Sequence, residues 1–371
     1  MANNALCATA LPAFDKATAT PGWPTATPRL AALLGQPLAI GNKIAPNRLW
    51  LAPLAGLGHT PFRELVTSYG VRPLLFTGMC SARAVPTENP ARSAVFSWRE
   101  EELPHLVCQL FGADPTDMAE AARRVEAEGF FGVDINMGCS VSALVKRGCG
   151  ADLLRDTERA LRMVDAMRKA VSIPLFVKFR TGWTPDPQPA AALAKQFEAA
   201  GVDCLVFHPR VAPDRRTHPA RRDHIRVISE AVSIPVMGNG DVFGPDDAEA
   251  MLNATGCAGV SIGRIGVARP WAFASWMGQL NDDPARNPDL WRETPLRMLA
   301  LLERHIAEPT RVVKMFRKFI LYYAANFSFG NTLYGRCMRG ESVEQLRHDL
   351  HEVFGALPQV AARPGMLLFT M

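Results

Sequence analysis

The sequence lacks any apolar run approaching the ~20 residues that a helix needs to cross a lipid bilayer, so we expect no membrane contact. Its eight cysteines include no C-x-x-C pair, which argues against a disulfide framework and a structural zinc site in a chain of 371 residues. We therefore expect a cytoplasmic protein with mostly buried thiols and no bound metal. The first 29 residues have neither the basic start nor the apolar stretch of a secretory signal, and we expect residues 1–36 to be a poorly ordered extension.

An excess of one charge is also missing, because the formal net charge is only +5. The distribution of charge says more. Six arginines lie between residues 209 and 226 against two acids, and from residue 293 to the end ten Lys or Arg face seven acids. Such basic segments can meet phosphates, although the second could instead be a solvated helix face. The residues for which we predict RNA contacts are Arg215, Arg216, Arg221, Arg222, Lys314, Arg317 and Lys318.

Eight short and nearly continuous apolar runs predict parallel strands that are covered by helices. They occupy residues 48–52, 73–76, 105–111, 131–135, 175–178, 204–208, 235–238 and 259–262. Amphipathic segments at 116–128, 157–171, 189–200 and 245–253 predict helices between them. Eight strand–helix units in about 230 residues match the size of a (β/α)₈ TIM barrel, an α/β fold.

The composition changes after the last predicted strand. We expect the barrel at residues 37–280, a polar and proline-bearing linker at 281–292, and a small helical C-terminal domain at 293–371. Helices are predicted in that domain at 295–307, 311–326 and 343–354.

Polar residues stand at the carboxyl ends of successive predicted strands, which is where such a barrel builds its active site. Asn239-Gly240-Asp241 follows the seventh strand, and Gly263-Arg264 follows the eighth. In this fold that corner commonly holds a phosphate, because loop N–H groups and a helix amino terminus converge there and an arginine adds charge. Either segment alone could be an ordinary turn, but the pair predicts a phosphate site.

Three more strand ends carry residues that suit a flavin. A lysine such as Lys178 would stabilise negative charge on a reduced flavin, and His208 could hydrogen-bond the ring or a bound pyrimidine. Taken singly, Lys178 could be paired to an acid and His208 could be a core histidine. Gln109 could donate to the flavin pyrimidine edge or cap a loop.

Cys139 follows the fourth strand. A thiol near an electropositive pocket can titrate near neutrality and deliver a proton. The alternative is a buried or merely reactive thiol, because only its place beyond the strand, with Asn136 three residues before it, distinguishes it from Cys149. Ala52 and Pro53, after the first strand, would give a flavin a flat backbone support.

Taken together these segments resemble the dihydrouridine synthases, flavoenzymes that reduce a uridine in RNA. The resemblance runs from about residue 37 to residue 278, and its most specific segment is Asp134 to Cys139. The other matching segments are Asn47 to Gly56, Pro61-Phe62-Arg63, Gly150-Ala151, Val177 to Arg180, His208, Arg210, Asn239-Gly240 and Gly263-Arg264. The helical tail, with Lys314, Arg317, Tyr322 and Tyr323, is similar to the family's C-terminal domain.

The resemblance implies a mechanism and a set of contacts. NADPH would reduce FMN, the hydride would pass from the flavin to C6 of a flipped-out uracil, and Cys139 would protonate C5. The implied uracil contacts are Asn136, Lys178, His208 and Arg210. The implied FMN contacts are Ala52, Pro53, Gln109, Lys178, His208, Asn239, Gly240, Asp241, Gly263 and Arg264. The implied partner is RNA, with tRNA favoured over rRNA, and no obligate protein partner is implied.

The chain also departs from the family pattern. Proline is usual where Ser140 stands, a carboxylate where Gly78 stands, and glycine where Pro209 stands. Two other functions therefore stay open: a flavin-barrel oxidoreductase for a small ene-carbonyl or pyrimidine, and a non-catalytic RNA-binding relative. The arginine-rich stretch and the helical tail favour an RNA substrate, because a small substrate needs neither.

Overall fold

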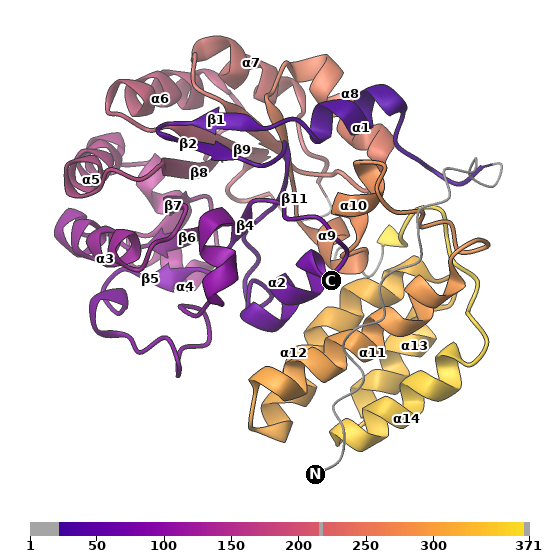
Figure 1. Cartoon of the computed structure of the whole chain (residues 1–371). Coiled ribbons are helices and arrows are strands. Elements are labelled where there is room, and N and C mark those ends of the chain that lie inside the picture. The colour runs from indigo at the N-terminus through magenta and orange to yellow at the C-terminus, as the bar shows by residue number, and fades with distance from the viewer. Residues whose placement is uncertain (1–21, 215–217, 367–371) are drawn as a thin grey trace.

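The computed structural model describes residues 22–214 and 218–366. These form a barrel of strands and helices and, beside it, a separate group of helices at the carboxyl end of the chain (Figure 1). No helix among the described residues is both long and apolar enough to cross a membrane.

A helix precedes the barrel. It is α1 (Pro28–Leu34), and its side chains Leu30 and Leu34, four residues apart, are buried. This spacing places both on one face, which packs into the main apolar core. The expectation of a poorly ordered extension over residues 1–36 is therefore wrong for α1, and residues 1–21 lie outside the described part of the chain.

Eight parallel strands form the barrel. They are β3 (Leu49–Leu51), β4 (Leu75–Phe76), β6 (Leu106–Phe111), β7 (Gly132–Met137), β8 (Leu175–Gly182), β9 (Cys204–Val211), β10 (Val236–Asn239) and β11 (Gly259–Ile262). They pair in the order β3, β11, β10, β9, β8, β7, β6, β4, and β5 (Cys80–Ser81) lies beside β6. The Leu51 N–H donates to the Leu74 carbonyl at 3.1 Å and brings the two ends of this order together. The predicted α/β barrel is confirmed.

Helices surround the barrel (Figure 1). The longer ones are α2 (Thr60–Thr67), α3 (Pro115–Ala127), α5 (Thr157–Ala170), α6 (Gln188–Ala199), α7 (Asp223–Ala231) and α8 (Pro245–Thr255). The shorter helices are η1 (Val85–Thr87), η2 (Glu100–His105), α4 (Ser142–Val145), η3 (Gly150–Leu154), α9 (Arg264–Ala268) and α10 (Ala272–Trp276), of which the η elements are 3₁₀-helices. Asp114 and Asp156 accept hydrogen bonds from first-turn N–H groups of α3 and α5, which fixes where these helices begin.

Apolar side chains fill the barrel interior near the amino ends of its strands. Trp50, Phe76 and Phe176 are buried there in edge-on and tilted contact. The hairpin of β1 (Leu38–Ile40) and β2 (Lys43–Ala45) packs on the same cluster and closes that end. The opposite end of the barrel is left for polar residues.

The helical tail follows the barrel. It consists of α11 (Pro288–His305), α12 (Pro309–Tyr323), η4 (Ala324–Asn326), α13 (Gly330–Arg339) and α14 (Val343–Phe354). The predicted helical C-terminal domain is thus present, but α11 begins inside the segment 281–292, where we expected a linker. Asp282, within that segment, is buried and accepts hydrogen bonds from the indole N–H groups of Trp23 and Trp271.

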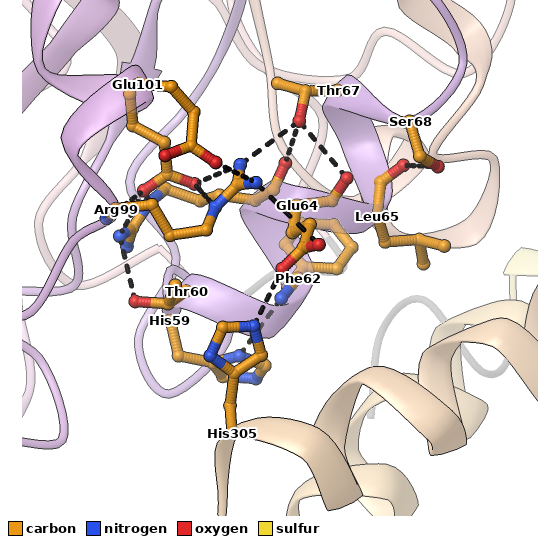
Figure 2. Close-up of polar contacts among 12 residues, drawn as sticks. His59, Thr60, Phe62, Glu64, Leu65, Thr67, Ser68, Arg99, Glu101 and His305 are labelled. Atoms are coloured by element: carbon orange, nitrogen blue, oxygen red, sulfur yellow. Dashed lines mark hydrogen bonds and ion pairs between the residues drawn. The ribbon is translucent and has the colours of Figure 1, made fainter. Parts of the chain in front are cut away.

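Buried polar contacts attach the tail to the barrel. Arg269, after α9, donates to Asn326 Oδ1 at 3.0 Å and lies over the ring of Trp291 at 5.3 Å. Figure 2 shows a second junction, where Glu64 on α2 lies between Arg99 and His305. His305 Nε2 lies 2.7 Å from a Glu64 oxygen, so α2 and α11 are held side by side.

Candidate active site at the carboxyl end of the barrel

Alternation along β8, β9 and β10 places polar side chains directly above the apolar interior. Each of these strands contributes to the interior cluster, through Phe176 on β8, Val206 on β9 and Met237 on β10. The residues two positions later are Lys178, His208 and Asn239. Because residues i and i+2 share a face of a strand, these three form the next layer toward the carboxyl ends.

A chain of hydrogen bonds crosses β6 and β7. Gln109 Nε2 donates to Asp134 Oδ2 at 2.6 Å, and Asn136 Nδ2 donates to Gln109 Oε1 at 2.9 Å. Asn136 Oδ1 in turn accepts from the backbone N–H of Cys139 at 3.0 Å. We call these four residues the amide relay. Burial raises the pKa of Asp134 to about 7, while the Gln109 bond and the charge of Lys178 act in the opposite direction.

The loop that carries Cys139 is fixed on both sides. Its N–H is bound to Asn136, and its carbonyl accepts from the Ala151 N–H at 2.9 Å. Gly150 has φ +63°, and a Cβ there would lie 2.4 Å from the Cys139 carbonyl oxygen. Only glycine fits this position. The half-buried thiol is therefore held at the rim of the barrel.

Two cations of β8 lie close to that thiol. Burial and the neighbouring charge of Arg180 lower the pKa of Lys178 to about 8, whereas Asp134 and Cys139 raise it. Lys178 Nζ lies 3.5 Å from Asn239 Oδ1. Burial also lowers the pKa of Arg180, and Cys139 again acts in the opposite direction. The site can thus stabilise a negative charge on sulfur or on a bound group.

His208 has a defined tautomer. Arg210 Nη1 lies 3.0 Å from His208 Nε2, and a guanidinium only donates hydrogen bonds, so Nε2 accepts and Nδ1 carries the ring proton. Burial lowers the pKa of His208 well below its usual range, and the charges of Lys178, Arg180 and Arg210 add to this. The ring is therefore neutral.

Asp241 organises the region where we expected a phosphate. Its two carboxylate oxygens each accept from Arg210 Nη2 at 2.7 Å, and Oδ1 also accepts from Arg264 at 3.0 Å. We call Asp241, Arg210 and Arg264 the arginine corner. Gly240 has φ +114°, and a Cβ there would come within 2.9 Å of His208 Cδ2. A glycine is thus required at position 240, between the arginine corner and His208.

The segment after β3 borders the same opening. Ala52 is buried and Pro53 half-buried, and a Cβ on Gly263 would contact the leucine that follows Pro53 at 3.5 Å. Lys318 of α12 reaches this segment from the other side, because its Nζ would lie 2.2 Å from a Cβ on Gly56. The tail therefore places a cation at the rim of the barrel mouth.

The chain matches the family described as Dihydrouridine synthase (Dus) over residues 50–356, which span the barrel and nearly all of the helical tail. The chain belongs to the dihydrouridine synthase family. Membership confirms the predicted enzyme class, an oxidoreductase of the dihydrouridine synthase type.

Two relatives agree with this assignment. The chain is 37% identical to tRNA-dihydrouridine synthase B of Pseudomonas aeruginosa over 234 residues, which cover 63% of this chain and 70% of that protein. It is 32% identical to the protein of the same name from Pectobacterium carotovorum over 320 residues, which cover 83% and 97%.

Two solved structures share the fold. Histamine dehydrogenase from Rhizobium sp. 4-9 has a TM-score of 0.52 at 14% identity, covering 73% of this chain and 51% of that longer chain. The old yellow enzyme from Trypanosoma cruzi has a TM-score of 0.50 at 12% identity, covering 70% and 95%. At such identities the likeness concerns the fold alone.

The residues predicted to contact RNA lie in two different settings in this dihydrouridine synthase. Arg221 pairs with Asp214, and Arg222 donates to the Asp241 carbonyl at 2.8 Å, so both are held within the barrel loops. Arg215 and Arg216 lie outside the described residues. On α12, Lys314 and Lys318 are exposed, while Arg317 donates to the Gly340 carbonyl at 2.8 Å.

Two residues of the site were not predicted individually. Asp134 and Arg180 lie in segments that resemble the family, but their roles depend on neighbours that are distant in sequence. The available signal was a charged residue inside an otherwise apolar strand, since an unpaired buried charge is costly. Arg210 is buried, with 4% exposed, and contacts His208 and Asp241, and its predicted contact with uracil stays a prediction.

Proposed function

We propose that this dihydrouridine synthase reduces uridine in tRNA to 5,6-dihydrouridine, with bound FMN and with NADPH as reductant. Family membership and the tRNA-dihydrouridine synthase relatives support the reaction and the substrate. The observation that carries the proposal is the Cys139 loop, which is fixed by Asn136 at the barrel mouth beside Lys178 and Arg180.

The residues at the barrel mouth fit FMN. Gly240 leaves space where a side chain would crowd His208, Gly263 leaves its backbone without a side chain, and Arg264 offers charge to a phosphate. Lys178 suits a reduced flavin ring, and the Gln109 amide suits its pyrimidine edge. The remaining proposed contacts are Ala52, Pro53, His208, Asn239 and Asp241. When bound, FMN supplies the hydride that the reduction needs.

The chain supplies the proton and holds the uracil. Cys139 would donate its thiol proton to C5 as the hydride arrives at C6, so the C5–C6 double bond becomes a single bond and a thiolate remains. Lys178 and Arg180 would stabilise that thiolate until it regains a proton from solvent. Asn136 and the neutral His208 would bind the uracil. NADPH and a proton are consumed for each uridine reduced.

The helical tail would bind the RNA backbone. Lys314 and Lys318 are exposed on the face of α12 that meets the barrel mouth, where they could contact phosphates on either side of a flipped-out uridine. We accordingly assign residues 37–280 to the catalytic domain and the tail to substrate binding.

The reaction is tested by mass spectrometry of RNA from cells with and without this gene, after separation of tRNA from rRNA. Loss of a +2 Da uridine at a defined tRNA position is expected, because reduction adds two hydrogens. Loss of the +2 Da uridine in rRNA alone would show that rRNA, and not tRNA, is the substrate. No loss in either fraction, from a protein that still binds FMN, would contradict the proposal and favour a small-molecule reductase or a non-catalytic relative.

A further inference from the structure

The amide relay has a fixed polarity from one end to the other. At one end, the Asp134 carboxylate can only accept, so Gln109 must present its NH₂ group there and its carbonyl oxygen to Asn136. At the other end, the N–H groups of Gly138 and Cys139 can only donate, at 3.2 and 3.0 Å, so Asn136 must present its oxygen to them. Both ends demand the same orientation of both amides.

This polarity survives protonation of the carboxyl. Asp134 is fully buried, and its Oδ1 has no hydrogen-bond partner among the described residues. The backbone N–H of Lys178 approaches the carboxyl and favours its ionised form, without making a bond of normal geometry. A neutral acid with its proton on Oδ1 still accepts through Oδ2.

The relay leaves part of Gln109 uncommitted. One of the two Nε2 hydrogens and one of the two Oε1 lone pairs are used, so a donor and an acceptor remain on the same amide. A flavin pyrimidine carries the complementary pair, a carbonyl next to an N–H. An amide in the opposite orientation would place its NH₂ group against the flavin N–H and its oxygen against the flavin carbonyl, and both hydrogen bonds would be lost.

The geometry points to Asp134 as a positioning residue that sets which edge Gln109 presents to the flavin and, through Asn136, holds the Cys139 loop. This inference rests on the proposed function for the flavin and for Cys139. Asp134 touches neither the flavin nor the uracil in this scheme and acts only through the two amides.

The first test compares two replacements of Asp134. Asp134→Asn keeps an acceptor at the same place, so FMN affinity should stay within about threefold of the wild type. Asp134→Leu removes the acceptor, and FMN affinity, measured by quenching of flavin fluorescence, should fall about tenfold, the loss of one oriented hydrogen bond. The rate at which iodoacetamide alkylates Cys139 in the apoprotein should also differ from the wild-type rate in Asp134→Leu, but not in Asp134→Asn. Equal behaviour of the two variants would overturn the inference.

A second pair of variants separates positioning from stability, and it applies even where Asp134→Leu does not fold. At pH 8.5, Asn136→Asp sets two carboxylates against one amide and should lower both the melting temperature and FMN affinity. Adding Asp134→Asn restores a complete chain of hydrogen bonds, but with the Gln109 amide reversed.

We expect the double variant to regain melting temperature while FMN affinity stays about tenfold low, since Gln109 then presents the opposite edge. Recovery of both quantities would show that Asp134 is only structural. A wild-type protein that binds no FMN would contradict the proposed function, whereas the alkylation of apoprotein would still test the relay.

Discussion

The two sides of the barrel mouth use different physics. On the side of β6 and β7 the amide relay joins one carboxyl group to the Cys139 loop through two amides, and its effect depends on which atom donates and which accepts. Across the barrel, the arginine corner packs two arginines around one carboxylate at 2.7 to 3.0 Å, and its effect depends on charge. One side can orient a ring, and the other can hold an anion.

This division suits a ligand with a polar ring at one end and a phosphate at the other. Hydrogen-bond direction discriminates between the edges of a heterocycle but adds little attraction at a distance. Charge attracts an anion strongly but is tolerant of orientation. Cys139 lies at the end of the relay, so the proposed proton donor belongs to the side where geometry is controlled most closely.

The largest effect is expected from removing the thiol at the end of the relay. Cys139→Ala should lower the rate of dihydrouridine formation by about 10²–10⁴-fold, the usual contribution of a positioned general acid, and should leave FMN bound. The rate is measured as dihydrouridine formed per enzyme in tRNA lacking the modification. Cys149→Ala, which changes a buried thiol ten residues on, is the control and should retain activity. Similar rates for both variants would remove Cys139 from the mechanism.

The next effect should distinguish the charged side from the oriented side. Arg264→Gln removes one cation of the arginine corner, and FMN should bind about 10- to 100-fold more weakly because a charge-assisted contact is lost. That deficit should shrink as salt rises, whereas the deficit of Asp134→Leu should not. Titrations at low and high salt measure both.

Arg221→Gln is the matched control for this measurement. It removes a cation paired with Asp214 outside the arginine corner and should leave FMN affinity nearly unchanged. If Arg264→Gln and Asp134→Leu respond to salt in the same way, the two sides do not differ as the contacts indicate.

Much of the barrel could be predicted because local patterns fixed it. The strand at β11 was predicted with its observed bounds, since glycine and cysteine-bearing turns isolate a short apolar run. The strand ends came to one rim because all eight strands are parallel. Helices α11 and α13 were misplaced or missed: α11 starts at a proline in a polar segment, and α13 begins with Gly330-Asn331-Thr332, which carries no apolar period.

The site was only partly predictable for a different reason. Cys139, Lys178 and Gln109 could be selected by their place at strand ends. The direction of a hydrogen bond could not, because it depends on pairs such as Gln109 and Asp134 that are brought together by strand register. The contact between Arg210 and His208 could not be predicted either, because it depends on side-chain conformations that the sequence pattern of β9 does not specify.

Acidification should change the free energy of unfolding in opposite directions through the carboxyl of the relay and through the buried histidines. Burial, with the nearby charges of Arg63 and Lys318, lowers the pKa of His59 to about 3, and burial lowers that of His105 to about 4. Below pH 6.5 the unfolded chain binds protons there that the folded chain does not. As the pH falls below 6.5, each histidine therefore lowers the free energy of unfolding by about 1.4 kcal/mol per pH unit.

Asp134 acts in the opposite direction. Its pKa is raised to about 7 from 3.8, so between these values the folded chain binds the proton first and gains about 1.4 kcal/mol per pH unit. Burial also lowers the pKa of His208 and of His224, so the histidines together outweigh the one carboxyl, and urea midpoints should fall from pH 6.5 to about pH 4. His59→Asn should flatten this fall and Asp134→Asn should steepen it. A wild-type stability that rises on acidification would contradict these assignments.

The smallest effect is expected at the rim, outside both sides of the mouth. Lys318 reaches the loop at Gly56 from α12, so Lys318→Ala should weaken tRNA binding only two- to fivefold, reduce the salt slope of binding by about one, and leave FMN affinity unchanged. Lys169→Ala, on an exposed face of α5 and paired with Asp165, is the control and should change neither quantity. A loss of FMN with Lys318→Ala would show that the tail helps to build the cofactor site, and the barrel mouth would then have three sides that act on FMN instead of two.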